Sequence, residues 1–390
     1  MIERRLGILV VLVLTGVTPY PVLSQDLGPL GSSPYDVVEG WLKPYADEGF
    51  AFGGNSGVFV ESLDRIFILQ RGETRLPDPV PTGFAGWAGS IGLNVLREPN
   101  RVWKNCIVVV DSTGNVLEVW DQWNHLFEGA DGPGPHRIRI SPYDPERRVW
   151  VVNETLHQIF VFSNDGRELV MTLGEKNIAG SGETHFGRPQ DVAFLPDGRV
   201  LVADGLDNHR IVIMDSAGNY LSEFGRFGNG RGEFNGVHAV AIGPDNRIFA
   251  LDRSGGRVQV FRVTGESNGL SQSGVEWIDV WDGFGLPLDL VVNEEHVWVS
   301  DLRPLKFVKL DFGGNRLYTW NLPNEGAIRF NEVHAFSVDS EGNMYGADNQ
   351  LGRTQKLVPK ADTDQELIIG RPFVAKSKRQ SLTAWMANGM

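Results

Sequence analysis

Short apolar runs separated by polar turns recur along almost the whole chain. Residues 187–213 and 236–261 show the pattern best, because each contains three runs rich in β-branched and aromatic residues, separated by an Asp-Gly or Asp-Asn turn. A fourth run, such as residues 221–225, follows. Runs of this length and composition predict strands linked by tight turns. The pattern therefore predicts an all-β protein whose repeating unit is a four-stranded antiparallel sheet.

The repeating unit is about 50 residues long, which is typical of propeller repeats. Aligning the units places six equivalent residues at what we call the mark positions: Ser56, His136, Gln190, His238, Leu288 and His334. Successive intervals from His136 onward are 54, 48, 50 and 46 residues, whereas the first is 80, because residues 74–105 are inserted. Units of this kind predict one six-bladed β-propeller over residues 25–374. We expect residues 36–41 to add the fourth strand of the last blade and residues 375–390 to form a polar tail.

Histidines occupy the mark positions of the second, fourth and sixth units. Since the first strand of each propeller blade lines the central channel, the three side chains should meet at the axis, about 120° apart. Three imidazoles with a vacant fourth position match catalytic zinc, and imidazole also suits iron, copper or nickel. The alternative is a set of hydrogen-bonded channel residues. We expect His136, His238 and His334 to bind a metal ion, with zinc as the first choice.

Two arginines share another position of the unit. Arg71 and Arg253 each follow the end of the second strand, so they should point to the same face as the histidines. Paired guanidinium groups near a metal favour an anionic substrate, most simply a carboxylate. Salt bridges between blades are the alternative role. Four acids also recur at one position, which favours a structural role in turn hydrogen bonding; they are Asp204, Asp252, Asp301 and Asp348.

The N-terminus predicts export. Arg4 and Arg5 precede an apolar run over residues 6–17, and residues 22–24 suit cleavage, so we expect residues 1–24 to be a signal peptide. An uncleaved membrane anchor is the alternative. Removal leaves 34 basic and 48 acidic residues, a net charge of −14, which disfavours nucleic acid and anionic membranes as partners. The single cysteine, Cys106, indicates no disulfide framework. We expect a secreted or periplasmic monomer.

These residues resemble the NHL-repeat propellers and, within them, the peptidyl-α-hydroxyglycine α-amidating lyases. The resemblance covers residues 55–360, including residues 66–72, 155–160 and 252–259. It implies zinc bound by the three histidines, a catalytic arginine at Arg71, and cleavage of an α-hydroxyglycine end to an amide and glyoxylate.

The chain departs from this family at several positions. The family's catalytic tyrosine is replaced by Leu206, and its disulfides cannot form with one cysteine. The family's calcium uses main-chain carbonyls at positions matching Val58 and Ile138 and an aspartate where this chain has Ala335, so the calcium ligand set is incomplete. Glu332 replaces a methionine two residues before the last histidine. It is a replacement base, an extra ligand or a solvated acid at the rim.

The leading hypothesis is an exported metal-dependent lyase acting on a small hydroxylated substrate or peptide C-terminus that bears a carboxylate. The metal would bind a substrate hydroxyl or water, Arg71 and Arg253 would orient the carboxylate, and a base other than tyrosine would take the proton. One alternative is a non-enzymatic NHL propeller that binds a protein or peptide, since a fold does not dictate a function. The other is a hydrolase or a different metal chemistry at the same histidines.

Overall fold

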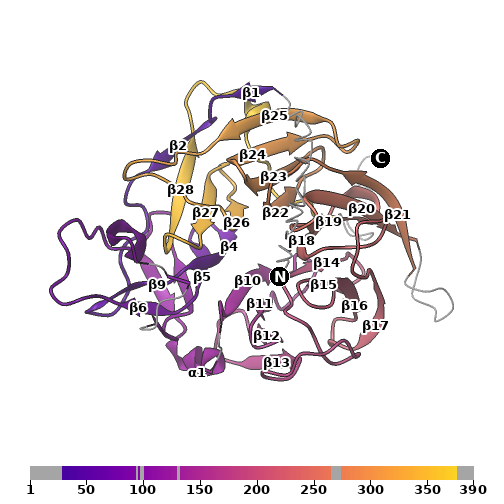
Figure 1. Cartoon of the computed structure of the whole chain (residues 1–390), viewed down its shortest axis with the longest axis horizontal. Helices are drawn as coiled ribbons and strands as arrows, with labels where there is room; N and C mark the ends of the chain where they lie inside the picture. Colours follow the sequence, from indigo (N-terminus) through magenta and orange to yellow (C-terminus); the bar gives the residue numbers. More distant parts are fainter. Residues whose placement is uncertain (1–28, 94, 97–100, 130–131, 265–273, 376–390) are drawn as a thin grey trace, which may run out of the picture.

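The structure, a computed structural model, describes residues 29–93, 95–96, 101–129, 132–264 and 274–375. In this part of the chain the protein is all-β, and its sheets stand side by side around a common centre as a β-propeller (Figure 1). Helices within these ranges are single turns, none long and apolar enough to cross a membrane. They are α1 (Asn124–Phe127), η1 (Ala88–Ile91), η2 (Asp121–Trp123), η3 (Pro244–Asn246) and η4 (Gln365–Leu367).

Most of the sheets follow the chain in order, with antiparallel neighbours from the centre outward. The first contains β4 (Asn55–Ser62), β5 (Arg65–Gln70), β8 (Ile107–Val110) and β9 (Val116–Val119). The next three contain β10 (Pro135–Ile140), β11 (Val149–Asn153), β12 (Gln158–Phe162) and β13 (Leu169–Leu173); β14 (Asp191–Phe194), β15 (Val200–Asp204), β16 (Arg210–Met214) and β17 (Tyr220–Phe224); and β18 (Val237–Ile242), β19 (Arg247–Asp252), β20 (Arg257–Val263) and β21 (Val275–Trp281).

The last two large sheets join the ends of the described chain. One contains β22 (Pro287–Val292), β23 (Val297–Leu302), β24 (Leu305–Leu310) and β25 (Arg316–Asn321), and β1 (Leu30–Gly31) adds to it in parallel. The other contains β26 (Ala335–Val338), β27 (Met344–Asp348) and β28 (Arg353–Pro359), to which β2 (Tyr35–Val38) adds antiparallel. The expected pairing of the N-terminal strand with the last unit is confirmed, whereas the sequence pattern did not indicate β1.

The insertion in the first unit forms a small separate sheet together with the segment that precedes β4. β3 (Phe50–Phe52) pairs with β6 (Glu73–Arg75), which pairs with β7 (Arg101–Val102). Ala51, Ala88 and Val95 form its small buried core. The insertion therefore packs beside the first unit without interrupting β4, β5 and β8.

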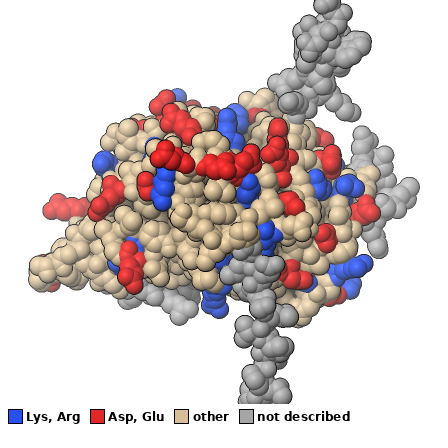
Figure 2. All heavy atoms as spheres, turned by 90° about the horizontal axis from the view of Figure 1, so that it is seen from above, with Lys and Arg blue, Asp and Glu red and all other residues tan. Residues whose placement is uncertain are grey.

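The core lies between sheets. Six buried clusters in the described part each join apolar side chains of two neighbouring large sheets, and one of them joins the last sheet to the first through Val58, Val108 and Tyr345. Each fully buried side chain of this size contributes about 1.5–3 kcal/mol. The ring is therefore closed by apolar packing as well as by strand pairing. Acidic side chains form a row across the outer edge seen in Figure 2, in keeping with the net charge of −13.

The four recurring aspartates stabilise the loops that lead to the mark positions. The carboxylate of Asp204 accepts a hydrogen bond from the Gly187 N–H at 2.7 Å, and that of Asp252 accepts one from the Gly236 N–H at 2.9 Å. Asp301 and Asp348 act alike on the loops before β22 and β26. A carboxylate that accepts backbone N–H groups satisfies donors that would otherwise be buried without partners. The predicted structural role is confirmed.

Candidate metal centre

The mark positions coincide with irregularities of the first strands. In β4, β10, β18 and β22 the register shifts at Ser56, His136, His238 and Leu288. Gln190 and His334 directly precede β14 and β26, and their N–H groups bond to carbonyls that lie opposite the next residue. A β-bulge redirects a side chain that strict alternation would place elsewhere. The mark residues therefore face the axis because each unit is irregular at the same point.

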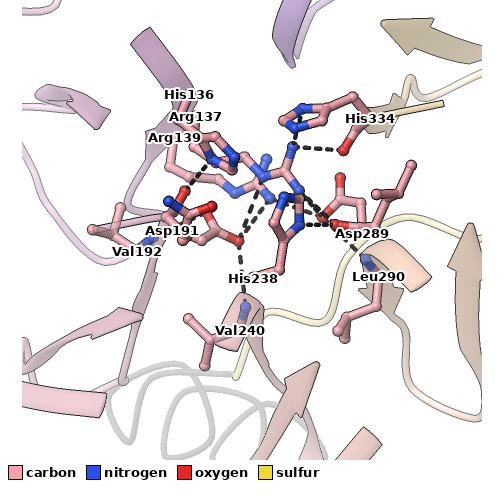
Figure 3. A network of polar contacts seen from close by, with 12 residues as sticks. His136, Arg137, Arg139, Asp191, Val192, His238, Val240, Asp289, Leu290 and His334 are labelled. Carbon is pink, nitrogen blue, oxygen red and sulfur yellow. Dashed lines mark hydrogen bonds and ion pairs between the residues drawn. The ribbon is translucent and has the colours of Figure 1, made fainter. Parts of the chain in front are cut away.

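The three histidines meet at the axis (Figure 3). Their ring centroids lie 4.6, 4.7 and 5.1 Å apart, and one ring nitrogen of each lies within 4.8 Å of the other two. All three side chains are buried. Distances of this size let a single ion contact three imidazoles at bond lengths near 2.0–2.1 Å.

Hydrogen bonds determine which nitrogen of each ring faces the axis. Nδ1 of His136 lies 2.6 Å from the carbonyl of Gln190, Nδ1 of His238 lies 2.6 Å from that of Leu288, and Nδ1 of His334 lies 2.7 Å from that of Ser56. The acceptors are the three mark residues that are not histidine. Because a carbonyl only accepts, each Nδ1 carries the hydrogen and each Nε2 keeps its lone pair. Nε2 of His238 is buried and has no partner in the described part.

One contact at His334 conflicts with a hydrogen on Nδ1. The Arg137 guanidinium Nη1 lies 3.1 Å from His334 Nδ1, and it also lies 2.6 Å from the His334 carbonyl. A guanidinium only donates, so it cannot bond to a nitrogen that carries a hydrogen. The shorter contacts decide: Nδ1 donates to Ser56 and Arg137 donates to the His334 carbonyl.

The surroundings keep the imidazoles neutral. Burial lowers the pKa of His136, His238 and His334 well below the ordinary 6.5. Nearby positive groups lower these pKa values further, among them Arg253 beside His238 and Arg137 beside His334. Neutral imidazole is the form that binds metal ions.

A second set of side chains follows the ends of the second strands. Arg71 follows β5 and Arg253 follows β19, as expected, and the same position after β11 and β27 holds Glu154 and Asn349. Glu154 is buried, and its Oε2 lies 3.5 Å from His136 Nε2. It also accepts hydrogen bonds from Gln190 Nε2 at 2.9 Å and Arg188 Nη2 at 3.3 Å. Sequence reasoning missed Glu154, although its position in the unit, shared with Arg71 and Arg253, was the signal.

Arg71 is a buried cation with few partners. Its exposed fraction is 2%, its Nη1 lies 3.9 Å from Glu154, and its Nε has no partner among the described residues. Burial lowers the pKa of Arg71 to about 10, an effect that Glu154 and Glu332 partly offset. Arg253 is partly buried, and the described residues contain no ion pair for it within 4.0 Å, so they offer no support for an inter-blade salt bridge. A buried guanidinium whose donors are not all satisfied favours an anionic partner.

Comparisons with known proteins show similarity to NHL-repeat proteins and to amidating lyases. The NHL repeat family matches residues 186–214. A probable peptidyl-α-hydroxyglycine α-amidating lyase of Caenorhabditis elegans is 34% identical over 238 residues, which cover 60% of this chain and 58% of that protein. The chain carries an NHL repeat and resembles the amidating lyases. A peptidyl-glycine α-amidating monooxygenase of Mus musculus is 34% identical over 136 residues, which cover 33% of this chain and 14% of that protein.

The match thus spans under two thirds of these relatives. A solved structure from Bacteroides thetaiotaomicron, of a protein of unknown function, shares the fold with a TM-score of 0.51 and 13% identity, covering 86% of this chain and 75% of that one.

Two departures from the amidating lyases lie near the site. Glu332 has an exposed fraction of 4%, so its interpretation as a solvated rim acid is wrong, because the fold buries it beside Gln350. Its Oε2 accepts a hydrogen bond from Gln350 at 3.1 Å, its Oε1 has no partner in the described part, and burial raises the pKa of Glu332. Leu206 lies next to Gly236, where a Cβ would be 3.4 Å from Leu206 Cδ2. This apolar side chain thus lies beside Gly236, which precedes His238 by two residues in the sequence.

Proposed function

We propose that this protein is an exported, metal-dependent lyase that acts on a small hydroxylated substrate bearing a carboxylate. A peptide ending in α-hydroxyglycine is the nearest specific substrate, by analogy with the amidating lyases that the chain resembles. The observation that carries the proposal is the convergence of three neutral, buried imidazoles, whose Nδ1–H groups are all occupied by carbonyls, beside the buried guanidinium of Arg71. Metal-binding histidines typically donate the N–H of their other ring nitrogen to a backbone carbonyl in this way.

His136, His238 and His334 would hold the ion through Nε2. The donor set fits a transition metal, because the unpartnered Nε2 of His238 is a buried acceptor that otherwise costs stability. Zinc is the first choice and iron or copper the next, since imidazole suits all three. When bound, such an ion acidifies a hydroxyl and polarises an oxygen.

Arg71 and Arg253 would bind the substrate carboxylate. Both lie at the end of the second strand of their units, and both have lowered pKa values because they are buried. A carboxylate between them would restore the counter-charge that the described residues provide only through Glu154 and Glu332. In a site of low dielectric such contacts hold the substrate in one orientation.

The reaction would break the bond between the hydroxylated carbon and the amide nitrogen. The hydroxyl loses its proton as the aldehyde of glyoxylate forms, and the amide nitrogen gains one. We assign the proton acceptor to Glu332, because its Oε1 has no partner in the described part and burial raises its pKa. Glu154 suits a positioning role, since its oxygens already accept hydrogen bonds from Arg188 and Gln190.

The wider organisation is proposed with the function. The six larger sheets would be the blades of a six-bladed propeller over residues 25–374, with four strands each and β1 as an addition. Residues 1–24 would be a signal peptide that directs a monomer to the periplasm or the medium, without nucleic acid or membrane as partner. Residues 1–24 and most of the predicted tail, 376–390, lie outside the described residues.

The test uses the mature, untagged protein and its His238→Ala variant. Metal content is measured by plasma mass spectrometry, and glyoxylate release is measured with α-hydroxyhippurate as substrate. About one equivalent of zinc, iron or copper in the parent, glyoxylate formation, and loss of both in a folded variant would support the proposal. A metal-free parent that forms no glyoxylate after incubation with each metal salt would overturn it, and would favour a propeller that binds a protein or peptide.

A further inference from the structure

The residues that follow the mark positions form a second ring around the axis. They are Gly57, Arg137, Asp191, Ala239, Asp289 and Ala335. Three are small, two are acidic and one is an arginine. The small side chains leave room at the axis for the long side chain of Arg137, which extends from β10 toward the opposite strands (Figure 3). Arg137 has an exposed fraction of 0%.

Oxygen atoms from four other units surround this guanidinium. Nη1 donates to the His334 carbonyl at 2.6 Å and to the Ser56 carbonyl at 3.4 Å, and Nη2 donates to the Leu288 carbonyl at 2.8 Å. The carboxylates of Asp289 and Asp191 lie 3.5 Å from Nη2 and 3.9 Å from Nε. Three carbonyls and two carboxylates around one positive charge are the kind of ligand set that a hard divalent cation takes in proteins.

Two of these carbonyls also orient the metal-binding histidines. The Leu288 carbonyl accepts from His238 Nδ1, and the Ser56 carbonyl accepts from His334 Nδ1. A carbonyl oxygen has two lone pairs, so it can accept from the imidazole and from Arg137 together. The guanidinium therefore fixes the positions of these two carbonyl oxygens, and through them the orientations of the two imidazole rings.

We propose that Arg137 is a built-in cation at the axis, which occupies the place of a structural metal ion and positions His238 and His334 through the carbonyls that it shares with them. Arg137 is a positioning residue, because it would act through the carbonyls that orient His238 and His334. Its effect on transition-metal affinity rests on the proposed function. Its role as a cation substitute does not, and is tested separately with calcium.

Arg139 is the matched control, because it lies two residues along the same strand and contacts the same acids. Its Nη2 lies 3.1 Å from Asp191 Oδ2 and 3.2 Å from Asp289 Oδ1. Its side-chain contacts in the described part include no carbonyl of a mark residue. Arg139 instead lines a cavity of about 230 Å³ at the other end of the first strands. Arg139→Ala thus removes a charge and two ion pairs and leaves the shared carbonyls bonded.

The experiment compares wild type, Arg137→Ala and Arg139→Ala in two measurements. The first is the thermal unfolding midpoint in chelator and in millimolar calcium. We expect calcium to raise the midpoint of Arg137→Ala alone, because only that variant frees the axial oxygens. The second is zinc affinity by competition with a chromogenic chelator. We expect the zinc affinity of Arg137→Ala to fall by about 10- to 100-fold, because the groups that orient the two histidines are disturbed, and to recover in calcium. Arg139→Ala should keep wild-type zinc affinity.

The outcomes separate the two proposals. The inference would be overturned if calcium does not change the unfolding midpoint of Arg137→Ala and the zinc affinity of that variant equals that of Arg139→Ala. If wild type binds none of zinc, iron and copper, the proposed function fails, and the calcium response of Arg137→Ala still decides the role of Arg137. If Arg137→Ala folds only when calcium is present, the inference is supported. If it folds under neither condition, Arg137→Gln, which keeps donor groups without the charge, is measured, and wild-type zinc affinity in that variant would overturn the inference.

Discussion

Replacing Arg71 should weaken recognition of the substrate carboxylate while leaving the three histidines and their metal unchanged. The described part offers this guanidinium one carboxylate at 3.9 Å and no partner for Nε, so its donors are available to a substrate. A hydrogen bond to a charged group contributes about 1.5–3 kcal/mol. Loss of a two-pronged contact to a carboxylate therefore corresponds to about 3–6 kcal/mol, or roughly 10²–10⁴ in kcat/KM.

The assay is steady-state kcat/KM with α-hydroxyhippurate and with its carboxamide analogue. Wild type should prefer the carboxylate by a factor at least as large as the loss in Arg71→Met, and Arg71→Met should keep only the part of that preference that Arg253 provides. Arg71→Lys should recover only part, because an ammonium group is a point charge without the planar fork.

Arg188→Met is the matched control, because Arg188 also contacts Glu154 but its side chain is 37% exposed. We expect that variant to change kcat/KM little. A preference for the carboxylate that is undiminished in Arg71→Met, or an equal loss in Arg188→Met, would refute the assignment of Arg71 to the carboxylate. Plasma mass spectrometry of each variant checks that the metal is retained.

Three further predictions concern the base and the scaffold. Glu332→Gln should lower kcat by about 10²–10⁴, and adding Leu206→Tyr should restore part of it; no loss in kinetic assays would exclude Glu332 as the base. Lys306→Ala should reduce the free energy of unfolding in urea by about 3–5 kcal/mol, because Lys306 Nζ lies 3.0 Å from Asp301 and both are buried. Lys306→Arg should lose less, since Arg257 pairs with Asp252 in the same way, and a loss below about 1 kcal/mol in the alanine variant would contradict this prediction. Burial and Glu332 raise the pKa of Asp348 from 3.8 to about 7, so the stability that its protonation contributes is full below about pH 4 and is lost as the pH rises through 7. The free energy of unfolding of wild type, measured in urea, should therefore fall relative to that of Asp348→Asn by at most roughly 1.4 kcal/mol per pH unit between pH 4 and pH 7. Parallel pH profiles of the two proteins would contradict the raised pKa.

The spacing of the strand pattern was sufficient to predict which residues share a position around the axis. A unit of four strands recurs, so residues with the same place in the unit have the same place in the fold, and the histidines and Arg71 with Arg253 followed from counting. The same rule predicted that residues near Asp36 would pair with the last unit, and β2 does. Glu154 shares the position of Arg71 in the unit, so the same counting could have identified it.

Contacts across the axis could not be predicted in that way. Strict alternation would place Arg137 on the other face of its strand from His136, and the register shift in β10 brings both residues to the centre. Its partners Ser56, Leu288 and His334 come from units far apart in sequence, and their backbone carbonyls carry no signal in the residue type. The burial of Glu332 likewise depends on how the loop before β26 packs.

By itself, the sequence of this protein determined the all-β fold, the period of the unit and the three imidazoles, because strand period and residue chemistry are local properties. Only the tertiary structure decided which ring nitrogen faces the axis, which acid lies beside it and which cation holds the centre. Those properties arise from hydrogen bonds and charges between units, where a shift of one residue in a strand changes which groups meet.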